Sequence, residues 1–383
     1  MMRARIVLPA KRISHYLKVS DSLFWILFLS VITVATRVML MLLIPGHMYY
    51  FDSYHYVSSA SDFISGGRVP SVDPPFTLLL GLWIVIFRSI SEPLLVARFL
   101  NIMLAIITSF GLFSLSRKFL DEQFAFMSTL LIMMEPIFLS FSITTHNDIF
   151  ALMNAVVSLN WALSQRKIFY VLGVPVTFAL AVQSKPFLYI VLGIPIILIY
   201  MHRIFRSKKS KRFRLALSLG ILIIFSLVPL SPFAQRYYSG ITRFDPITKA
   251  TIFLRLEIIQ FIIDRIFLLT NINFIDISFR VLFIVGNIVV FYVLLDRFRR
   301  NNKAVNQGTI QFLPSFMLII AYLCILAFTI FVIPYTIVDG TVIPILDLNR
   351  RYLLWPRLAI LWVDTFALWK IISTMIKHPE VKT

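Results

Sequence analysis

The chain has 383 residues, of which 59% are hydrophobic and only 14% are charged, and its mean hydropathy is +0.85. Ordinary soluble domains carry roughly 25% charged residues, so a water-soluble fold could not bury this much apolar surface. The net charge is +19, but the basic residues cluster between apolar runs, as they do beside membrane spans, and this argues against a nucleic-acid partner. The single cysteine, Cys324, excludes a disulfide within the chain. We therefore predict an all-α polytopic membrane protein with a single membrane domain over residues 1–383.

Apolar segments of about the length that crosses a bilayer recur along the whole chain. In chain order they cover residues 22–44, 93–115, 122–141, 149–164, 168–183, 186–201, 215–233, 279–297, 311–333 and 352–372. The basic cluster from Arg203 to Arg214 marks a cytoplasmic segment, because Lys and Arg accumulate on that side, and the basic residues before the first span place the N-terminus there too. We predict about ten transmembrane helices with both termini in the cytoplasm, and we favour the plasma membrane of a prokaryote over the endoplasmic reticulum.

The apolar segment 76–87 decides which loops share a side of the membrane. Its twelve residues would extend about 18 Å as a helix, whereas the hydrocarbon core is about 30 Å thick. We therefore interpret this segment as interfacial or re-entrant. This choice puts the basic pairs at 117–118 and 166–167 inside, and it brings the loops 45–75 and 144–148 together on the outer side.

Two outer loops are predicted to carry helices that lie on the membrane surface. The first outer loop covers residues 45–92. The second covers residues 234–277, and within it charged residues interrupt the apolar segment 249–269. A helix of this kind lies in the interface, because its apolar side contacts lipid while its charged side stays in water.

Asp52 precedes a short helical pattern in the first outer loop. Tyr54, Val57, Ala60 and Ile64 recur at helical spacing, which predicts an amphipathic helix with Asp52 at its start. One interpretation of Asp52 is an N-cap, a role that Asp commonly fills. The other is a base held at the membrane–water boundary by aromatic neighbours. Tyr54 and His55 follow it closely and could contact an acceptor.

Asp148 lies at the start of the predicted span 149–164, within the sequence Thr-Thr-His-Asn-Asp. It could cap the helix. Because the predicted topology places it on the same outer surface as Asp52, the two carboxylates could also form an acid–base pair or hold a divalent metal. His146 could add a ligand, although a lone His near a helix start is usually an ordinary polar residue. We assign no metal ligand.

Four basic residues are predicted on the outer side, against the usual bias toward the cytoplasm. Lys185 lies at the turn between two short spans, where it could extend to the interface or bind a phosphate. Arg350 and Arg351 precede the last span, and a guanidinium can bind two phosphate oxygens at once. Arg236 is a weaker candidate of the same kind.

Three charged residues lie inside predicted spans, where charge is costly and usually paired or functional. They are Arg37, Glu135 and Asp364. Arg37 could pair with Asp364, because the first and last helices of a bundle can be neighbours. Glu135 is followed by Pro136, which should kink its helix. Alternatively, these charges could mark an ion pathway.

The first outer loop resembles that of the GT-C glycosyltransferases. The similarity lies in Asp52, in the run Ala-Ser-Asp-Phe-Ile-Ser-Gly-Gly-Arg-Val-Pro at 60–70, and in Pro74-Pro75 before an apolar stretch. The pattern is similar to that of polyprenyl- or dolichyl-phosphate-mannose-dependent mannosyltransferases such as GPI mannosyltransferase I. Many members have a second acid where Ser53 stands, and the second loop lacks an Asp-x-Asp, so metal dependence is left open.

Other elements extend this resemblance. Asp148 matches the second acidic position of that fold, and Lys185 resembles a lysine that often follows the next helix pair. Arg350-Arg351-Tyr352 resembles an Arg-Tyr element before a late helix in protein mannosyltransferases and aminoarabinose transferases. The resemblance covers roughly residues 45–190, and beyond them it rests mostly on hydropathy.

The resemblance implies inverting transfer of a sugar, expected to be mannose, from a polyprenyl-phosphate donor to an acceptor hydroxyl on the non-cytoplasmic face. Asp52 would be the base, and Asp148 would position the acceptor or a metal. Lys185, Arg350 and Arg351 would stabilise the departing phosphate. The acceptor could be a glycan, a lipid or a protein, and membrane lipids and a membrane subunit are expected as partners. The rival functions are a transporter or lipid flippase and a non-catalytic subunit of a larger enzyme.

Overall fold

The structure is a computed structural model. It describes residues 21–43, 51–67, 73–89, 91–118, 120–164, 166, 168–184, 193, 196–201, 203–204, 209–227, 273–300, 335–338, 341–344 and 354–377. The predicted span 311–333, most of 186–201 and the predicted surface helix 249–269 lie outside these residues. The second outer loop, 234–277, lies outside them except for its last five residues.

Helices form almost all of the described structure, as the composition predicts. They are α2 (Asp21–Leu43), α3 (Phe51–Gly66), α4 (Pro74–Phe87), α5 (Pro93–Ser116), α6 (Glu122–Met133), α7 (Pro136–Ile143), α8 (Asn147–Ala162), the π-helical turn η1 (Phe169–Gly173), α9 (Val174–Ser184), α11 (Lys209–Leu227), α15 (Asn273–Arg300) and α18 (Leu354–Lys377). A short antiparallel hairpin, β1 (Tyr335–Val338) and β2 (Thr341–Pro344), lies in a connection for which no strand was predicted. Proline begins α4, α5 and α7, because the first turn of a helix needs no backbone N–H.

Two described helices are long and apolar enough to cross a membrane, α5 and the Leu23–Leu43 part of α2. The pair α6 and α7 forms a third candidate, with a bend of 66° between its halves. Hydropathy predicted this pair as one span, and the kink predicted at Pro136 is confirmed. The total of ten spans stays a prediction, as does the non-crossing interpretation of α4.

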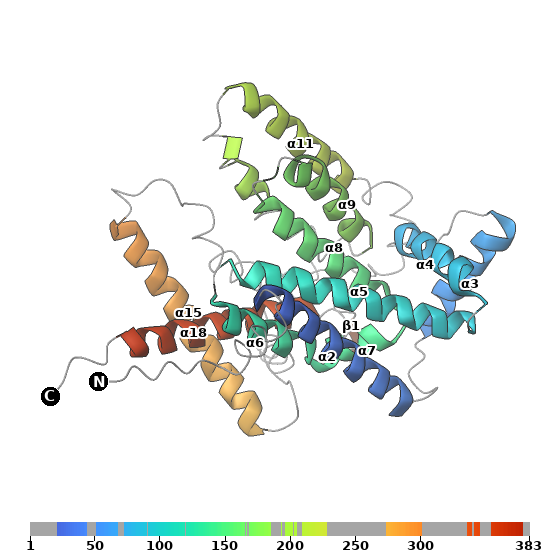
Figure 1. Cartoon of the computed structure of the whole chain (residues 1–383), viewed down its shortest axis with the longest axis horizontal. Coiled ribbons are helices and arrows are strands. Elements are labelled where there is room, and N and C mark those ends of the chain that lie inside the picture. Colours follow the sequence, from blue (N-terminus) through green and yellow to red (C-terminus); the bar gives the residue numbers. More distant parts are fainter. Residues whose placement is uncertain are drawn as a thin grey trace.

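Helix α5 lies at the centre of the described structure (Figure 1). It packs against α2, α4 and α8, and α8 in turn packs against α9. At one end of the molecule α3 packs on α4, and at the other α18 packs on α15 and α6 (Figure 1). The core that these helices share is built from fully buried apolar side chains such as Phe113, Phe138 and Trp362.

Glu135, at the break between α6 and α7, is buried, and charged side chains from two other helices reach this break. Glu135 caps α7, with Oε2 accepting a hydrogen bond of 2.8 Å from the Phe138 amide. Its Oε1 accepts from Arg357 Nη1 of α18 at 2.9 Å. From α2, Arg37 donates to the Met133 carbonyl at 2.8 Å and to Ser142 Oγ at 3.0 Å. The Met133 carbonyl, the Phe138 amide and the Glu135 carboxylate at the break therefore each have a partner.

The predicted pairing of Arg37 with Asp364 is wrong. Arg37 contacts the α6–α7 break, because α2 packs on α5, α6 and α7, whereas α18 packs on α15 and α6. Asp364 is 2% exposed, and neither carboxylate oxygen has a hydrogen-bond partner among the described residues. The first and last described helices thus both reach the α6–α7 break, but Arg37 binds Met133 and Ser142 there, not Asp364.

The predicted cytoplasmic residues Lys118 and Arg203 come together at the C-terminal end of α8. Lys118 Nζ donates to the Asn160 carbonyl at 3.1 Å, and Arg203 Nη2 donates to the Ser164 carbonyl at 2.8 Å. Both cations therefore meet the partial negative charge of a helix C-terminus. The N-terminal end of the same helix carries the Thr-Thr-His-Asn-Asp sequence, so α8 separates the basic end from the acidic one.

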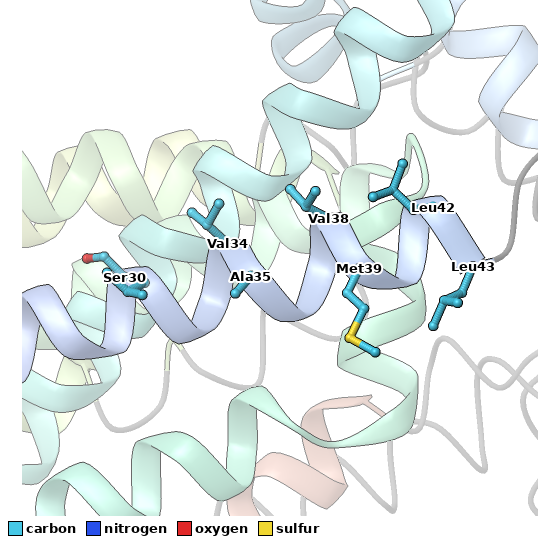
Figure 2. Close-up of a pocket in the computed structure, with 8 residues that line it drawn as sticks. Ser30, Val34, Ala35, Val38, Met39, Leu42 and Leu43 are labelled. Atoms are coloured by element: carbon cyan, nitrogen blue, oxygen red, sulfur yellow. The ribbon is translucent and has the colours of Figure 1, made fainter.

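An apolar groove of about 700 Å³ follows α2 from Ser30 to Leu43 (Figure 2). Among the described residues that line it, Ser30 is the only polar one. A groove of this kind suits hydrocarbon chains and offers nothing to a sugar or a phosphate. The sugar and the phosphate of a substrate would therefore bind outside this groove.

Candidate active site

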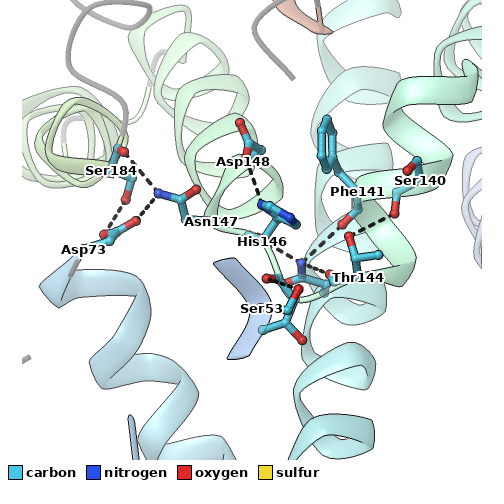
Figure 3. A network of polar contacts seen from close by, with 11 residues as sticks. Ser53, Asp73, Ser140, Phe141, Thr144, His146, Asn147, Asp148 and Ser184 are labelled. Atoms are coloured by element: carbon cyan, nitrogen blue, oxygen red, sulfur yellow. Dashed lines mark hydrogen bonds and ion pairs between the residues drawn. The ribbon is translucent and has the colours of Figure 1, made fainter. Parts of the chain in front are cut away.

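The start of α3 is tied to the loop before α8. Asp52 is the second residue of α3, and its side chain lies outside what the structure describes. The next residue, Ser53, is fully buried and donates from Oγ to the Thr145 carbonyl at 3.1 Å (Figure 3). Consecutive Cα atoms lie about 3.8 Å apart, so the backbone of Asp52 lies close to the sequence that contains Asp148.

The loop between α7 and α8, which is predicted on the outer side of the membrane, is buried within the protein. Every residue from Phe141 to Phe150 is buried. The Asn101 side chain of α5 donates to the carbonyls of Thr144 and His146, at 2.5 and 2.9 Å. Arg98, also on α5, donates from Nε to the Ile143 carbonyl at 2.7 Å. These two side chains satisfy backbone groups that a buried loop would otherwise leave unpaired.

His146 and Asp148 lie at the N-terminal end of α8. His146 occupies the N-cap position and Asp148 the first turn, where the helix dipole favours a negative charge. His146 Nδ1 lies 3.6 Å from Asp148 Oδ2. The imidazole ring meets the rings of Phe141 and Tyr56 edge-on, with centroid distances of 5.1 and 6.4 Å. The aromatic rings fix its orientation beside the carboxylate.

A second buried network joins α4, α8 and α9. Asp73, immediately before α4, accepts from Asn147 Nδ2 at 2.5 Å and from Ser184 Oγ at 3.1 Å (Figure 3). Asn147 Nδ2 also donates to the Ser184 carbonyl at 3.2 Å. The three side chains thus connect the N-terminal end of α8 with the C-terminal end of α9.

A divalent metal at this site would bind His146 and Asp148, whose side chains could supply one nitrogen and one oxygen ligand. Among the described residues, no group of three or more His, Cys, Asp or Glu side chains could hold a metal ion. Two protein ligands would leave a divalent ion largely hydrated, and the imidazole nitrogen suits Zn²⁺ or Fe²⁺ better than Mg²⁺, which prefers oxygen ligands.

Of the other predicted site residues, the structure describes Tyr54 and His55. Tyr54 is 55% exposed and His55 is also exposed, so both lie on the outer side of α3, away from the buried His146. Lys185 lies outside the described residues, directly after Ser184, the last residue of α9. Arg236, Arg350 and Arg351 also lie outside them.

Sequence reasoning missed four residues of this polar region, namely Asp73, Arg98, Asn101 and Asn147. A usable signal existed for Asp73, because an Asp directly before Pro74-Pro75 is typical of a helix start. Arg98 and Asn101 lie three residues apart in a predicted span, where polar side chains usually have a partner or a function.

Residues 73–230 match the family described as dolichyl-phosphate-mannose-protein mannosyltransferase. This match contains Asp73, Asp148 and Ser184, whereas Asp52 and Arg350 lie outside it. No curated protein matches the chain.

Three solved structures of the oligosaccharyltransferase from Archaeoglobus fulgidus share the fold. The structure tethered to an acceptor peptide aligns with a TM-score of 0.50 and 14% identity over 94% of this chain and 51% of that one. The complex of this enzyme, AglB, with an inhibitory peptide and a dolichol-phosphate gives a TM-score of 0.50 and 14% identity, covering 94% and 52%. The apo form gives 0.51 and 14%, covering 92% and 51%.

The chain spans about half the length of these solved structures. At this level of identity the alignments establish the arrangement of the helices. Together, the family match and the shared fold agree with the resemblance found in the first outer loop. The chain therefore shares the fold of these oligosaccharyltransferase structures, and its residues 73–230 resemble the dolichyl-phosphate-mannose-protein mannosyltransferase family.

Proposed function

We propose that the protein is a glycosyltransferase that moves a sugar from a polyprenyl-phosphate donor to an acceptor hydroxyl at the outer membrane face. Mannose is the expected sugar, since the matched family uses a dolichyl-phosphate-mannose donor by its description. The lipid tail of such a donor would lie among apolar helix surfaces, and its phosphate would sit at the membrane boundary. The acceptor is a glycan, a lipid or a protein.

In this proposal Asp52 takes the proton from the acceptor hydroxyl. The acceptor oxygen forms a bond to the anomeric carbon from the face opposite the phosphate. The bond between that carbon and the phosphate oxygen breaks, so the configuration inverts and the lipid phosphate leaves with the electron pair. Lys185, Arg350 and Arg351 stabilise the charge on that phosphate, and Asp148 positions the acceptor or a metal.

One observation carries the proposal, namely the hydrogen bond from Ser53 to the Thr145 carbonyl. It joins the helix that starts beside Asp52 to the loop that leads to Asp148, although 92 residues separate its partners. Asp73 and Ser184 extend the same polar region toward Lys185. Asp52, Asp73 and Asp148 come from three different segments of this polar region. Such a gathering of acids is expected for a site that binds a hydroxyl and a phosphate.

The hypothesis of a transporter or flippase is based on three charged residues within predicted spans, and two of them have structural partners. Arg37 and Glu135 are both engaged at the α6–α7 break, where they satisfy backbone and side-chain partners. Charges held in this way stabilise a bent helix and do not form a path for ions. Asp364 alone does not define a pathway.

The test is a transfer assay with the purified protein in nanodiscs and a radiolabelled polyprenyl-phosphate mannose. Wild-type protein should transfer label to a hydroxyl acceptor, and Asp52→Asn should lower kcat by about 100-fold or more, because general-base catalysis contributes 10²–10⁴-fold. The matched control is Asp62→Asn, which removes an exposed acid from the same helix and should leave the rate unchanged. Wild-type activity retained in Asp52→Asn would exclude Asp52 as the base, and a wild-type protein without transfer from any polyprenyl-phosphate sugar would refute the function.

A further inference from the structure

Asp73 has a left-handed backbone conformation, which is unusual for a residue other than glycine. Its φ and ψ are 40° and 70°, and it is the only non-glycine residue with positive φ in the part of the chain that the structure describes. Its side chain is buried, with the residue 8% exposed. Left-handed backbone conformations of non-glycine residues are strained, and they persist only where the surroundings enforce them.

The cap of α4 does not explain this strain. The hydrogen bond from the Phe76 amide to Asp73 Oδ1 measures 3.4 Å, which is long for an N–H donor. The two tertiary bonds, from Asn147 and Ser184, are shorter at 2.5 and 3.1 Å. The carboxylate is therefore aimed at α8 and α9 more closely than at its own helix.

The two partners of Asp73 each precede a predicted site residue. Asn147 is followed by Asp148, and Ser184 is followed by Lys185. One carboxylate thus binds the side chain that directly precedes Asp148, and it binds the last residue of α9, which Lys185 follows in the sequence. Because Asn147 also donates to the Ser184 carbonyl, the three groups form a closed triangle (Figure 3).

We infer that Asp73 is a positioning residue, which fixes the N-terminal end of α8, where Asp148 lies, against the C-terminal end of α9 through its hydrogen bonds to Asn147 and Ser184. This inference rests on the proposed function. Asp73 itself exchanges no proton with the substrate. Its effect comes from geometry, since a displacement of about 1 Å at a reacting centre can cost about 100-fold in rate.

Two substitutions separate this role from the alternatives. Asp73→Gly adopts positive φ without strain and is well tolerated at an N-cap, but it removes both tertiary hydrogen bonds. Asp73→Asn keeps the volume and tolerates positive φ. Its oxygen can accept from Asn147 and its amide can donate to the Ser184 hydroxyl, so the triangle survives without the charge.

The positioning role predicts that Asp73→Gly lowers kcat by about 100-fold and raises KM for the polyprenyl-phosphate sugar, measured per folded molecule in nanodiscs. Asp73→Asn should retain most of the activity, and the pH profile of kcat should be unchanged in both variants. An Asp73→Gly protein with wild-type kcat and KM would reduce Asp73 to a helix cap. An Asp73→Asn protein as inactive as Asp73→Gly would show that the charge, not the geometry, matters.

A binding measurement distinguishes failure of this inference from failure of the proposed function. Dolichyl phosphate binding is measured by thermal shift, and Asp73→Gly should weaken it while Asp73→Asn preserves it. A wild-type protein that binds this lipid but transfers no sugar refutes the function alone. If the wild-type protein transfers sugar and the Asp73→Gly variant has unchanged kinetics and binding, the positioning role alone is refuted. If the wild-type protein neither binds the lipid nor transfers sugar, both the function and the positioning role are refuted.

Discussion

Arg357 donates to Glu135 over 2.9 Å, although 222 residues separate the two in the chain. Both side chains are almost fully buried, at 7% and 1% exposure. The pair closes the α6–α7 break against the last described helix, and the break itself follows from Pro136. Pro136 thus breaks the helix locally, and Arg357 from the distant helix α18 binds the acid at that break.

Removing one member of this pair should destabilise the fold strongly. Arg357→Met leaves Glu135 buried without its cation, and breaking a buried ion pair in this way costs about 3–5 kcal/mol. The double variant Arg357→Met with Glu135→Met should lose much less than the sum of the single variants. The free energy of unfolding in mixed micelles measures both.

The exposed pair Arg117–Glu122, at 3.4 Å, is the matched control. Exposed ion pairs contribute about 0–1 kcal/mol, so Arg117→Met should change the unfolding free energy little. Equal losses from Arg117→Met and Arg357→Met would contradict the structural role assigned to the buried pair.

Lys118 should make stability depend on alkaline pH. Burial and, to a lesser extent, the nearby charge of Arg203 lower the pKa of Lys118 from its ordinary value of 10.5 to about 8. Between pH 8 and 10.5 the unfolded chain therefore binds a proton that the folded protein has released. The free energy of unfolding should rise through that window, by about 2–3 kcal/mol at its upper end.

The measurement for Lys118 is the unfolding free energy at several pH values from 7 to 10.5, for the wild type and for Lys118→Met, which cannot titrate at this position. The difference between the two proteins should be flat below pH 8 and should grow above it. A difference that stays constant across the whole range would show that the pKa of Lys118 is not lowered by folding.

Hydropathy was sufficient to predict helices where the structure has α2, α5 and α18, because a bilayer requires apolar runs of about 20 residues. The kink at Pro136 was equally accessible, since proline removes a backbone donor wherever it occurs. Arg357 could have been identified as well, because it is a charge within a predicted span, and the rule that drew attention to Arg37 applies to it.

The pairing of distant polar residues was not accessible from the sequence. Chain order suggests Asp364 as the partner of Arg37, but the packing of α2 on α6 and α7 gives Arg37 the carbonyl of Met133 and the hydroxyl of Ser142. Asp73 shows the same limit, because a helix-start signal says nothing about Asn147 and Ser184, which reach it only when α8 and α9 pack together. The base Asp52 stays a prediction.

Ser53 should affect transfer more than stability. Ser53→Ala removes the hydrogen bond to the Thr145 carbonyl, which is worth about 1 kcal/mol, and leaves that buried acceptor unpaired. Because this bond ties the start of α3 to the loop before α8, we expect kcat to fall by about tenfold or more through misplacement of Asp52. Ser58→Ala is the control on the same helix, since Ser58 is exposed. Unchanged kcat in Ser53→Ala would mean that the contact does not position the site.

Asn101 should be the most sensitive single residue of the buried loop. Its amide nitrogen lies within hydrogen-bond distance of three carbonyl oxygens, those of Phe141, Thr144 and His146, at 3.3, 2.5 and 2.9 Å. Asn101→Asp replaces that donor by an oxygen that faces the same acceptors. Each buried acceptor left unsatisfied costs about 1–3 kcal/mol, so the protein should unfold at markedly lower temperature or fail to accumulate.

Asn154 provides the comparison for Asn101, because it is also buried but donates only within its own helix, to the Phe150 carbonyl at 2.9 Å. That carbonyl can keep its helical hydrogen bond, so Asn154→Asp should cost less than Asn101→Asp. The thermal midpoints of both variants in the same nanodisc lipid decide the point. If Asn154→Asp were the more damaging change, the loop before α8 would not depend on α5 for its backbone partners, and the support inferred for His146 and Asp148 would be lost.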